Sequence, residues 1–150
     1  MATTPSEDQN SNEAVFADRE LLQSNDKTPR FTLKGNFVAK CVNVYDGDTA
    51  QFTFRLARSF SVVRFTCRFE GYNCAEIRGK TEEERTRAKE VAAILREKIL
   101  NKIVDLKVGD FDPRGRPLVT VCLNGININQ WMLDNGYGCA YNGLGEKKWK

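Results

Sequence analysis

Four short groups of polar residues have the types and spacing that phosphate and cation chemistry use. In Asp46-Gly47-Asp48-Thr49, the Asp48 carboxylate is expected just beyond a tight turn and suits a hard cation, which prefers oxygen ligands. The other three groups are Arg68, Asn73-Cys74-Ala75-Glu76 and Asp112-Pro113-Arg114-Gly115-Arg116-Pro117. The arginines in these groups suit an anion such as phosphate, because guanidinium groups pair with phosphate oxygens in a bidentate manner.

Each group also has an ordinary structural explanation. Asp46-Gly47 is a strong hairpin signal in its own right, and the 112–117 segment reads as a polar turn between strands. Arg68 could be an ordinary exposed arginine on a strand, Asn73 a turn residue, and Glu76 a surface charge. No group is decisive alone, so the elements that carry them must be considered together.

Hydrophobic periodicity predicts those elements. Alternating or β-branched runs predict strands over 36–45, 50–56, 61–70, 104–108 and 117–123. Thr81 and Glu84 form a T-x-x-E capping box before a helical stripe, which predicts a helix over 82–101. A second helix is predicted over 128–134, with Asn127 as its N-cap and Gly136 as its stop.

Three strands, a long helix, two strands and a second helix follow the order of one known barrel type. The sequence therefore predicts an α+β, mainly β fold: a five-stranded OB-fold barrel with a long helix between strands 3 and 4 and a second helix after strand 5. Such barrels often bind nucleic acid, but a fold alone does not assign a function.

Composition sets the wider limits. The chain has 150 residues, 41% hydrophobic and 29% charged, which is normal for a globular domain. It has no histidine, which excludes histidine-based triads and metal sites, and no apolar run of membrane-spanning length. Five cysteines without a C-x-x-C motif or a secretory signal predict free thiols and an intracellular location, cytoplasmic or nuclear.

Charge divides the chain into three parts. Residues 1–30 hold six acidic and three basic side chains and predict a flexible acidic leader, with one short amphipathic turn around Phe16, Leu21 and Leu22. The folded domain is expected over 31–142, followed by a basic tail over 143–150. The body is basic, which suits a polyanionic partner.

The motifs taken together resemble the staphylococcal-nuclease-like (thermonuclease) family over roughly residues 36–142. The matching text is VNVYDGDT at 42–49, TCRFEGYNCAEIRG at 66–79, FDPRGRPLV at 111–119 and INQWMLDNGYGCAY at 128–141. The combination in this order is specific, although each motif is short.

The resemblance implies a nuclease mechanism and a role for each matching position. It implies a calcium ion, or Mg²⁺ or Mn²⁺ in its place, held by Asp48, Asn73 and the backbone carbonyl of Cys74. It implies Glu76 as the general base, and Arg68 and Arg116 as the groups that grip the phosphate. Arg114 and Tyr141 are expected to contact the substrate.

Three departures from the family pattern change the expectations. Asn73 replaces an aspartate, so we expect weaker metal binding; Cys74 replaces a threonine, whose backbone carbonyl role is kept. Pro113 and Arg114 replace a lysine and a tyrosine, and Gly143 falls where another tyrosine is usual, so the grip on substrate is expected to differ.

Three functions remain open from the sequence. The first is a metal-dependent endonuclease, a hydrolase acting on ester bonds of DNA or RNA with little sequence preference and a preference for single strands. The second is a nucleic-acid-binding OB-fold module whose catalysis is weak or lost because of Asn73. The third is an interaction domain, although no obligate protein partner or membrane association is indicated.

Overall fold

The computed structural model describes residues 18–150, and the chain divides into two compact units, Met1–Phe31 and Thr32–Lys150. In the first unit, helix α2 (Arg19–Gln23) begins after Asp18, whose side chain accepts a hydrogen bond from the Leu21 N–H. Leu21 and Leu22 are 65% and 55% exposed, so this short helix buries no apolar face. Phe16, which we grouped with them, lies outside the described residues.

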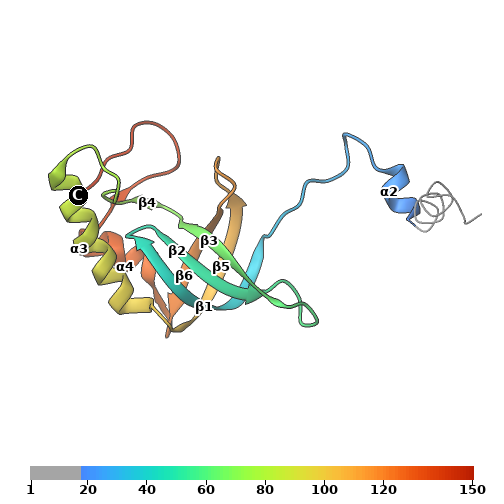
Figure 1. The fold of residues 1–150 in the computed structure, drawn as a ribbon, viewed down its shortest axis with the longest axis horizontal. Coiled ribbons are helices and arrows are strands. Elements are labelled where there is room, and N and C mark those ends of the chain that lie inside the picture. Colours follow the sequence, from blue (N-terminus) through green and yellow to red (C-terminus); the bar gives the residue numbers. More distant parts are fainter. Residues whose placement is uncertain (1–17) are drawn as a thin grey trace, which may run out of the picture. The chain divides into compact units, whose positions relative to one another are not determined.

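The second unit is built on five long strands that close into a barrel (Figure 1). They run antiparallel in the order β3-β2-β1-β5-β6, and a parallel pairing of β3 with β6 closes the ring. This confirms the predicted OB-fold class. The strands are β1 (Gly35–Asp46), β2 (Thr49–Arg55), β3 (Val62–Phe69), β5 (Ile103–Phe111) and β6 (Pro117–Leu123), with a short β7 (Ile126–Asn127) paired to β6.

Alternation along the strands fills the barrel interior, as the sequence predicts. Ala50, Phe52 and Phe54 of β2 are buried, and they face inward because successive side chains point to opposite sides of a strand. Leu56 lies beyond the end of β2 and is 36% exposed, so the strand predicted over 50–56 is one residue too long at its C-terminal end.

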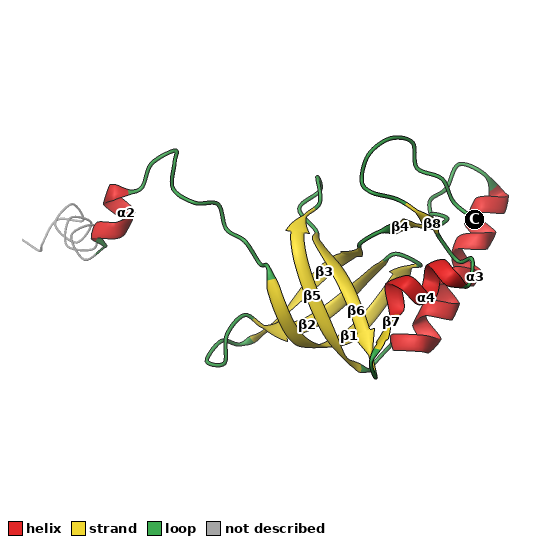
Figure 2. Cartoon of the chain, turned by 180° about the vertical axis from the view of Figure 1, so that it is seen from behind, coloured by secondary structure: helices red, strands yellow, loops and turns green. Residues whose placement is uncertain are grey.

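Two helices cover one end of the barrel (Figure 2). Helix α3 (Glu82–Ile99) ends two residues before the predicted limit, and its apolar stripe from Ala88 to Ile99 is buried. Thr81 caps it by accepting from the Glu84 N–H at 3.1 Å. Helix α4 (Ile128–Asp134) matches its predicted range, with Asn127 as the cap.

A second, two-stranded sheet was not predicted. Strand β4 (Tyr72–Asn73) pairs antiparallel with β8 (Cys139–Ala140), and the Tyr141 N–H donates to the Gly71 carbonyl at 2.9 Å. Strands of two residues carry no periodicity to read. Their pairing joins the segment after β3 to the segment after α4, which brings two sets of candidate residues together.

The five cysteines are free thiols, as expected. Burial raises the pKa of Cys41 to about 11 and that of Cys67 to about 12, so both are neutral and unreactive at physiological pH. None of the helices among residues 18–150 combines the length and apolar composition that a membrane span needs.

Candidate active site

The site begins at the turn between β1 and β2. Asp46 pairs with Thr49, so the two turn residues are Gly47 and Asp48, and the prediction that Asp48 lies beyond the turn is wrong by one position. Glycine is required here by close approach: a Cβ on Gly47 would lie 2.4 Å from Val91 Cγ1 of α3 and 2.8 Å from Cys74 Sγ. The turn is therefore packed directly onto the long helix.

Asp48 is a buried carboxylate with every oxygen engaged. Its Oδ2 accepts from the Cys74 N–H at 3.0 Å and forms an ion pair with Arg68 Nη1 at 3.0 Å. Its Oδ1 accepts from the Thr49 hydroxyl at 3.0 Å. Burial, together with the neighbouring charge of Asp48, raises the pKa of Asp46 above its ordinary value.

Arg68 is buried rather than exposed, which overturns its alternative as an ordinary surface arginine. Only 7% of it is accessible, although it lies on the strand face expected to meet solvent. The reason is the barrel closure: β3 meets β6 here, with Arg68 opposite Leu118, and the chain then turns back. Arg68 donates to the carbonyls of Phe69 at 3.2 Å and Tyr72 at 3.1 Å.

Asn73 stands on β4 beside this arginine. Its Oδ1 accepts from Arg68 Nη2 at 2.7 Å, and its Nδ2 donates to the backbone carbonyl of Lys148 at 3.2 Å. The side chain of Cys74 is turned away, with Sγ donating to the Tyr137 carbonyl at 3.2 Å, and burial raises the pKa of its thiol. Asp48, Arg68, Asn73 and Cys74 thus form one connected cluster.

Arg116 approaches the cluster from the turn between β5 and β6. Asp112 holds it, accepting from Arg116 Nε at 2.7 Å and from its backbone N–H at 2.8 Å, while the Arg114 N–H donates at 2.9 Å. Arg116 Nη1 lies 3.5 Å from the Thr49 hydroxyl, which in turn bonds Asp48. This contact links the two predicted phosphate-binding arginines through the β1–β2 turn.

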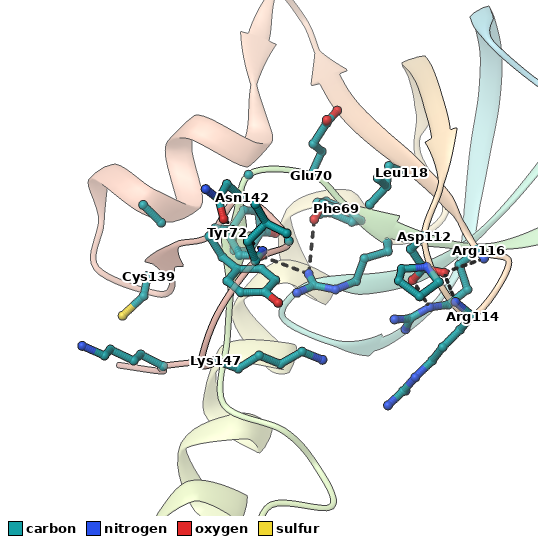
Figure 3. Close-up of a pocket in the computed structure, with 18 of the residues that line it drawn as sticks. Phe69, Glu70, Tyr72, Asp112, Arg114, Arg116, Leu118, Cys139, Asn142 and Lys147 are labelled. Carbon is teal, nitrogen blue, oxygen red and sulfur yellow. Dashed lines mark hydrogen bonds and ion pairs between the residues drawn. The ribbon is translucent and has the colours of Figure 1, made fainter.

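A cleft of about 1010 Å³ runs between these elements (Figure 3). Arg68, Arg114, Arg116 and Tyr141 all line it. One wall is the Asp112–Arg116 turn, and another is the chain after Tyr141. Asp48, Asn73 and Cys74 lie behind Arg68 and are not part of the lining.

Glu76 is the candidate that the structure leaves apart from the others. Its side chain is exposed and does not line the cleft. Its backbone N–H donates to Glu84 Oε1 at 3.4 Å, and Glu84 Oε2 accepts from the Lys80 N–H at 3.2 Å. Glu84 was read as a capping-box residue; its carboxylate instead holds the segment that carries Glu76.

Two further residues of the site carried no recognisable signal. Tyr72 is 1% exposed and donates its hydroxyl to the Gly47 carbonyl at 2.7 Å, which fixes the turn that bears Asp48. Asn129 accepts from the Val121 N–H and donates to the carbonyls of Val119 and Glu70, which ties α4 to the closing strands. Both act through long-range partners that a single sequence does not reveal.

Asp48 and Asn73 offer the oxygen ligands that a hard cation prefers, but the amide of Asn73 brings no negative charge. Asp48 Oδ2 and Asn73 Oδ1 both bond the Arg68 guanidinium, the first through Nη1 at 3.0 Å and the second through Nη2 at 2.7 Å. A cation there would compete with Arg68 for both oxygens. Among residues 18–150 no group of three or more acidic, cysteine or histidine side chains gathers around a common centre.

A closed five-stranded barrel with arginines from β3 and the β5–β6 turn at one cleft defines an OB-fold protein with an arginine-lined cleft. The chain belongs to the staphylococcal nuclease homologue family, whose model matches residues 66–149. Membership connects it with nuclease and nucleic-acid-binding function. The matched stretch contains Arg68, Glu76, Arg116 and Tyr141. No curated protein matches the chain significantly.

Proposed function

We propose that this chain is an endonuclease that hydrolyses phosphodiester bonds of DNA, RNA or both, with little sequence preference. The observation that carries the proposal is the parallel pairing of β3 with β6. It sets Arg68 opposite Leu118, two positions after Arg116, so that both arginines reach one cleft.

The arginines would supply most of the charge stabilisation. Hydroxide attack on a phosphodiester is resisted by the negative charge of the ester, and fixed N–H donors offset that charge as it grows. Asp112 orients Arg116, and the Phe69 and Tyr72 carbonyls orient Arg68, so both guanidinium groups are held in place before substrate binds. Glu76 would accept the proton of the attacking water; because its exposed side chain does not line the cleft, this role rests on its match to the family pattern.

The proposed metal is Ca²⁺, with Mg²⁺ or Mn²⁺ as alternatives, held by Asp48, Asn73 and the backbone carbonyl of Cys74. When bound, such an ion would supply further charge stabilisation on a phosphate oxygen. Asn73 contributes no charge, so millimolar rather than micromolar metal is expected to be needed.

Tyr141 and Arg114 suit a single-stranded substrate. Both line the cleft, and Tyr141 is half-buried with its backbone bonded to Gly71. An unpaired base can stack on a tyrosine ring, whereas a base inside a duplex is not available for stacking.

The test is cleavage of labelled single-stranded DNA and RNA by the full chain with Ca²⁺, Mg²⁺, Mn²⁺ or a chelator. Wild-type protein is expected to cut with at least one ion, and Glu76→Gln to lose about a hundredfold or more. Glu83→Gln, an exposed glutamate in the first turn of α3, is the matched control and should cut normally. No cutting by wild type or by Asn73→Asp under any ion would refute the proposal.

One observation favours the alternative of a binding module with lost catalysis. Both side-chain oxygens expected to hold the cation are bonded to Arg68, and Asn73 lacks the charge that would draw a cation in. This alternative predicts salt-dependent binding of single strands with no cleavage in any metal. The same assay, with binding measured alongside cleavage, separates the two functions.

A further inference from the structure

The chain after Tyr141 comes back to the barrel and forms a strap, defined here as residues 142–150. One end is fixed by the β4–β8 pairing and by the Tyr141 N–H, which donates to the Gly71 carbonyl. The other end is fixed by Asn73, which donates to the Lys148 carbonyl, and by Arg87 Nε, which donates to the Lys150 carbonyl at 2.9 Å. Figure 1 shows this end of the chain beside the start of α3.

The strap forms one wall of the cleft. Strap residues 142–144 and 146–148 supply a large share of the lining, and Asp112, Arg114 and Arg116 of the β5–β6 turn supply another. Figure 3 shows Lys147 and the two arginines of that turn bordering the same space. Whatever enters the cleft therefore meets side chains of the strap as well as the arginines of the barrel.

The charge of this wall suits a nucleic-acid backbone. Arg68, Arg114 and Arg116 line the cleft from the barrel, and Lys147 and Lys148 add two cations from the strap. The acidic residues among the lining are Glu70, Asp112 and Glu146, of which Asp112 is already paired with Arg116. Cations on two sides of a cleft suit the phosphates of one strand passing between them.

The amide at position 73 is the feature that joins the strap to the arginine cluster. Asn73 is 3% exposed; its Oδ1 accepts from Arg68 and its Nδ2 donates to Lys148. An ionised aspartate has acceptors but no donor, so it would keep the first bond and lose the second. It would also place a negative charge against a carbonyl oxygen.

We propose that Asn73 is a positioning residue that latches the strap against the barrel, and that Lys147 of the latched strap contacts a backbone phosphate of the bound single strand. The phosphate contact rests on the proposed function, whereas the latch does not. The sequence suggests that asparagine in place of aspartate at position 73 weakens a metal site. In the latch, the same asparagine has a structural role, because its amide supplies the donor to the strap.

Trp149 provides a direct reporter of the latch. It is half-buried, unlike the rest of the strap, and it shares a hollow of about 500 Å³ with Glu82, Glu83, Thr86, Arg87 and Glu90 of α3. Release of the strap would expose its indole to water. The other tryptophan, Trp131, lies on α4 and can be replaced by phenylalanine so that Trp149 emission is seen alone.

The latch is tested without nucleic acid and in the presence of a chelator. In the Trp131→Phe background, Asn73→Asp is expected to shift Trp149 emission to longer wavelength and to speed trypsin cleavage after Lys147 and Lys148 several-fold. Asn135→Asp is the matched control, because Asn135 Nδ2 also donates to a backbone carbonyl, that of Trp131, at 2.8 Å. The latch would be refuted if Asn73→Asp had the same emission wavelength and the same trypsin cleavage rate as the Trp131→Phe parent.

A second variant keeps the test decisive if Asn73→Asp fails to fold. Asn73→Ser removes the Nδ2 donor to the Lys148 carbonyl without adding a buried charge, and trypsin should again cut the strap several-fold faster. A strap in Asn73→Ser that is as resistant as wild type would likewise refute the latch.

The phosphate contact is tested by anisotropy of a fluorescent single-stranded oligonucleotide, with a chelator present to prevent cleavage. Lys147→Ala is expected to weaken binding several-fold and to lower the salt slope by about 0.7, the value for one phosphate on a single strand. Lys102→Ala, which removes an exposed lysine outside the cleft, should leave both unchanged. In Asn73→Asp, the further change Lys147→Ala should have little effect, because the strap is already released.

The outcomes separate the two claims. If Lys147→Ala bound the oligonucleotide with wild-type affinity and wild-type salt dependence, the phosphate contact would be refuted while the proposed nuclease function stayed intact. A wild-type protein that binds no oligonucleotide at low salt would refute both the proposed function and the contact, and the Trp149 emission would still decide the latch.

Discussion

Arg68 and Asp48 form an ion pair inside the end of the barrel, with Nη1 and Oδ2 3.0 Å apart and side chains that are 9% and 7% exposed. The pair is not isolated, because the Arg68 guanidinium also satisfies the carbonyls of Phe69 and Tyr72 and the amide oxygen of Asn73. The group proposed to bind phosphate is therefore also the group that neutralises the interior of the site.

Removing Arg68 should cost stability as well as function. Arg68→Ala leaves the Asp48 carboxylate buried without its cation, and loss of one partner of a buried pair costs about 3–5 kcal/mol. Urea denaturation should show this loss, whereas Arg64→Ala, at an exposed position of the same strand, should change stability by less than about 0.5 kcal/mol. An Arg68→Ala protein within 1 kcal/mol of wild type would show that the pair is structurally dispensable.

The packing of Gly47 predicts a second stability effect. In Gly47→Ala the new Cβ would meet Val91 and Cys74 at 2.4 and 2.8 Å, so the turn or the helix must move, at a cost of about 1–3 kcal/mol. Because Asp48 is the next residue, binding of single strands should weaken too. Gly109→Ala is the control: its Cβ would have no neighbour closer than 3.7 Å, so wild-type stability is expected. Thermal unfolding compares the two; equal melting temperatures would contradict the close contact.

Most of the fold could be predicted from the sequence, because it depends on local patterns. Alternation in 50–54, the Thr81 cap and the Asn127 cap each gave elements that the structure confirms. The arrangement of the site depends instead on pairs far apart in the chain. The burial of Arg68 follows from the closure of β3 on β6, and the second bond of Asn73 reaches Lys148. No periodicity encodes such contacts, so the sequence predicts the residues of the site better than their partners.

Glu84 is expected to act on catalysis through Glu76. Its carboxylate accepts from the backbone N–H groups of Glu76 and Lys80, so its removal should loosen the segment that presents the proposed base. Glu84→Ala should lower kcat by about tenfold to a hundredfold with little change in KM, since small displacements of a reacting group have effects of this size.

Steady-state cleavage kinetics separate this role from general destabilisation. Glu84→Gln keeps one acceptor oxygen and should recover part of kcat, while Glu83→Ala, in the same turn, should behave as wild type. A rise in KM with kcat unchanged would place Glu84 in substrate binding and not in the positioning of Glu76.

The turn that carries Arg116 should respond to acid through Asp112. Burial alone would raise the pKa of Asp112, but bonds from the Arg116 N–H and guanidinium and from the Arg114 N–H outweigh it and hold that pKa below its usual value. A carboxyl group whose pKa is lowered by folding stabilises the protein above its unfolded pKa of about 4, and this stabilisation is lost as the pH falls through the lower folded value.

Asp112→Asn should therefore cost about 1–2 kcal/mol at pH 7, and the difference from wild type should shrink below about pH 4. Asp110→Asn is the matched control, because Asp110 is 75% exposed in its surface pair with Lys34 and should show almost no such pH-dependent difference. Urea unfolding from pH 3 to 8 measures both variants, and a cost for Asp112→Asn that stays constant over this range would contradict the assigned charge interaction.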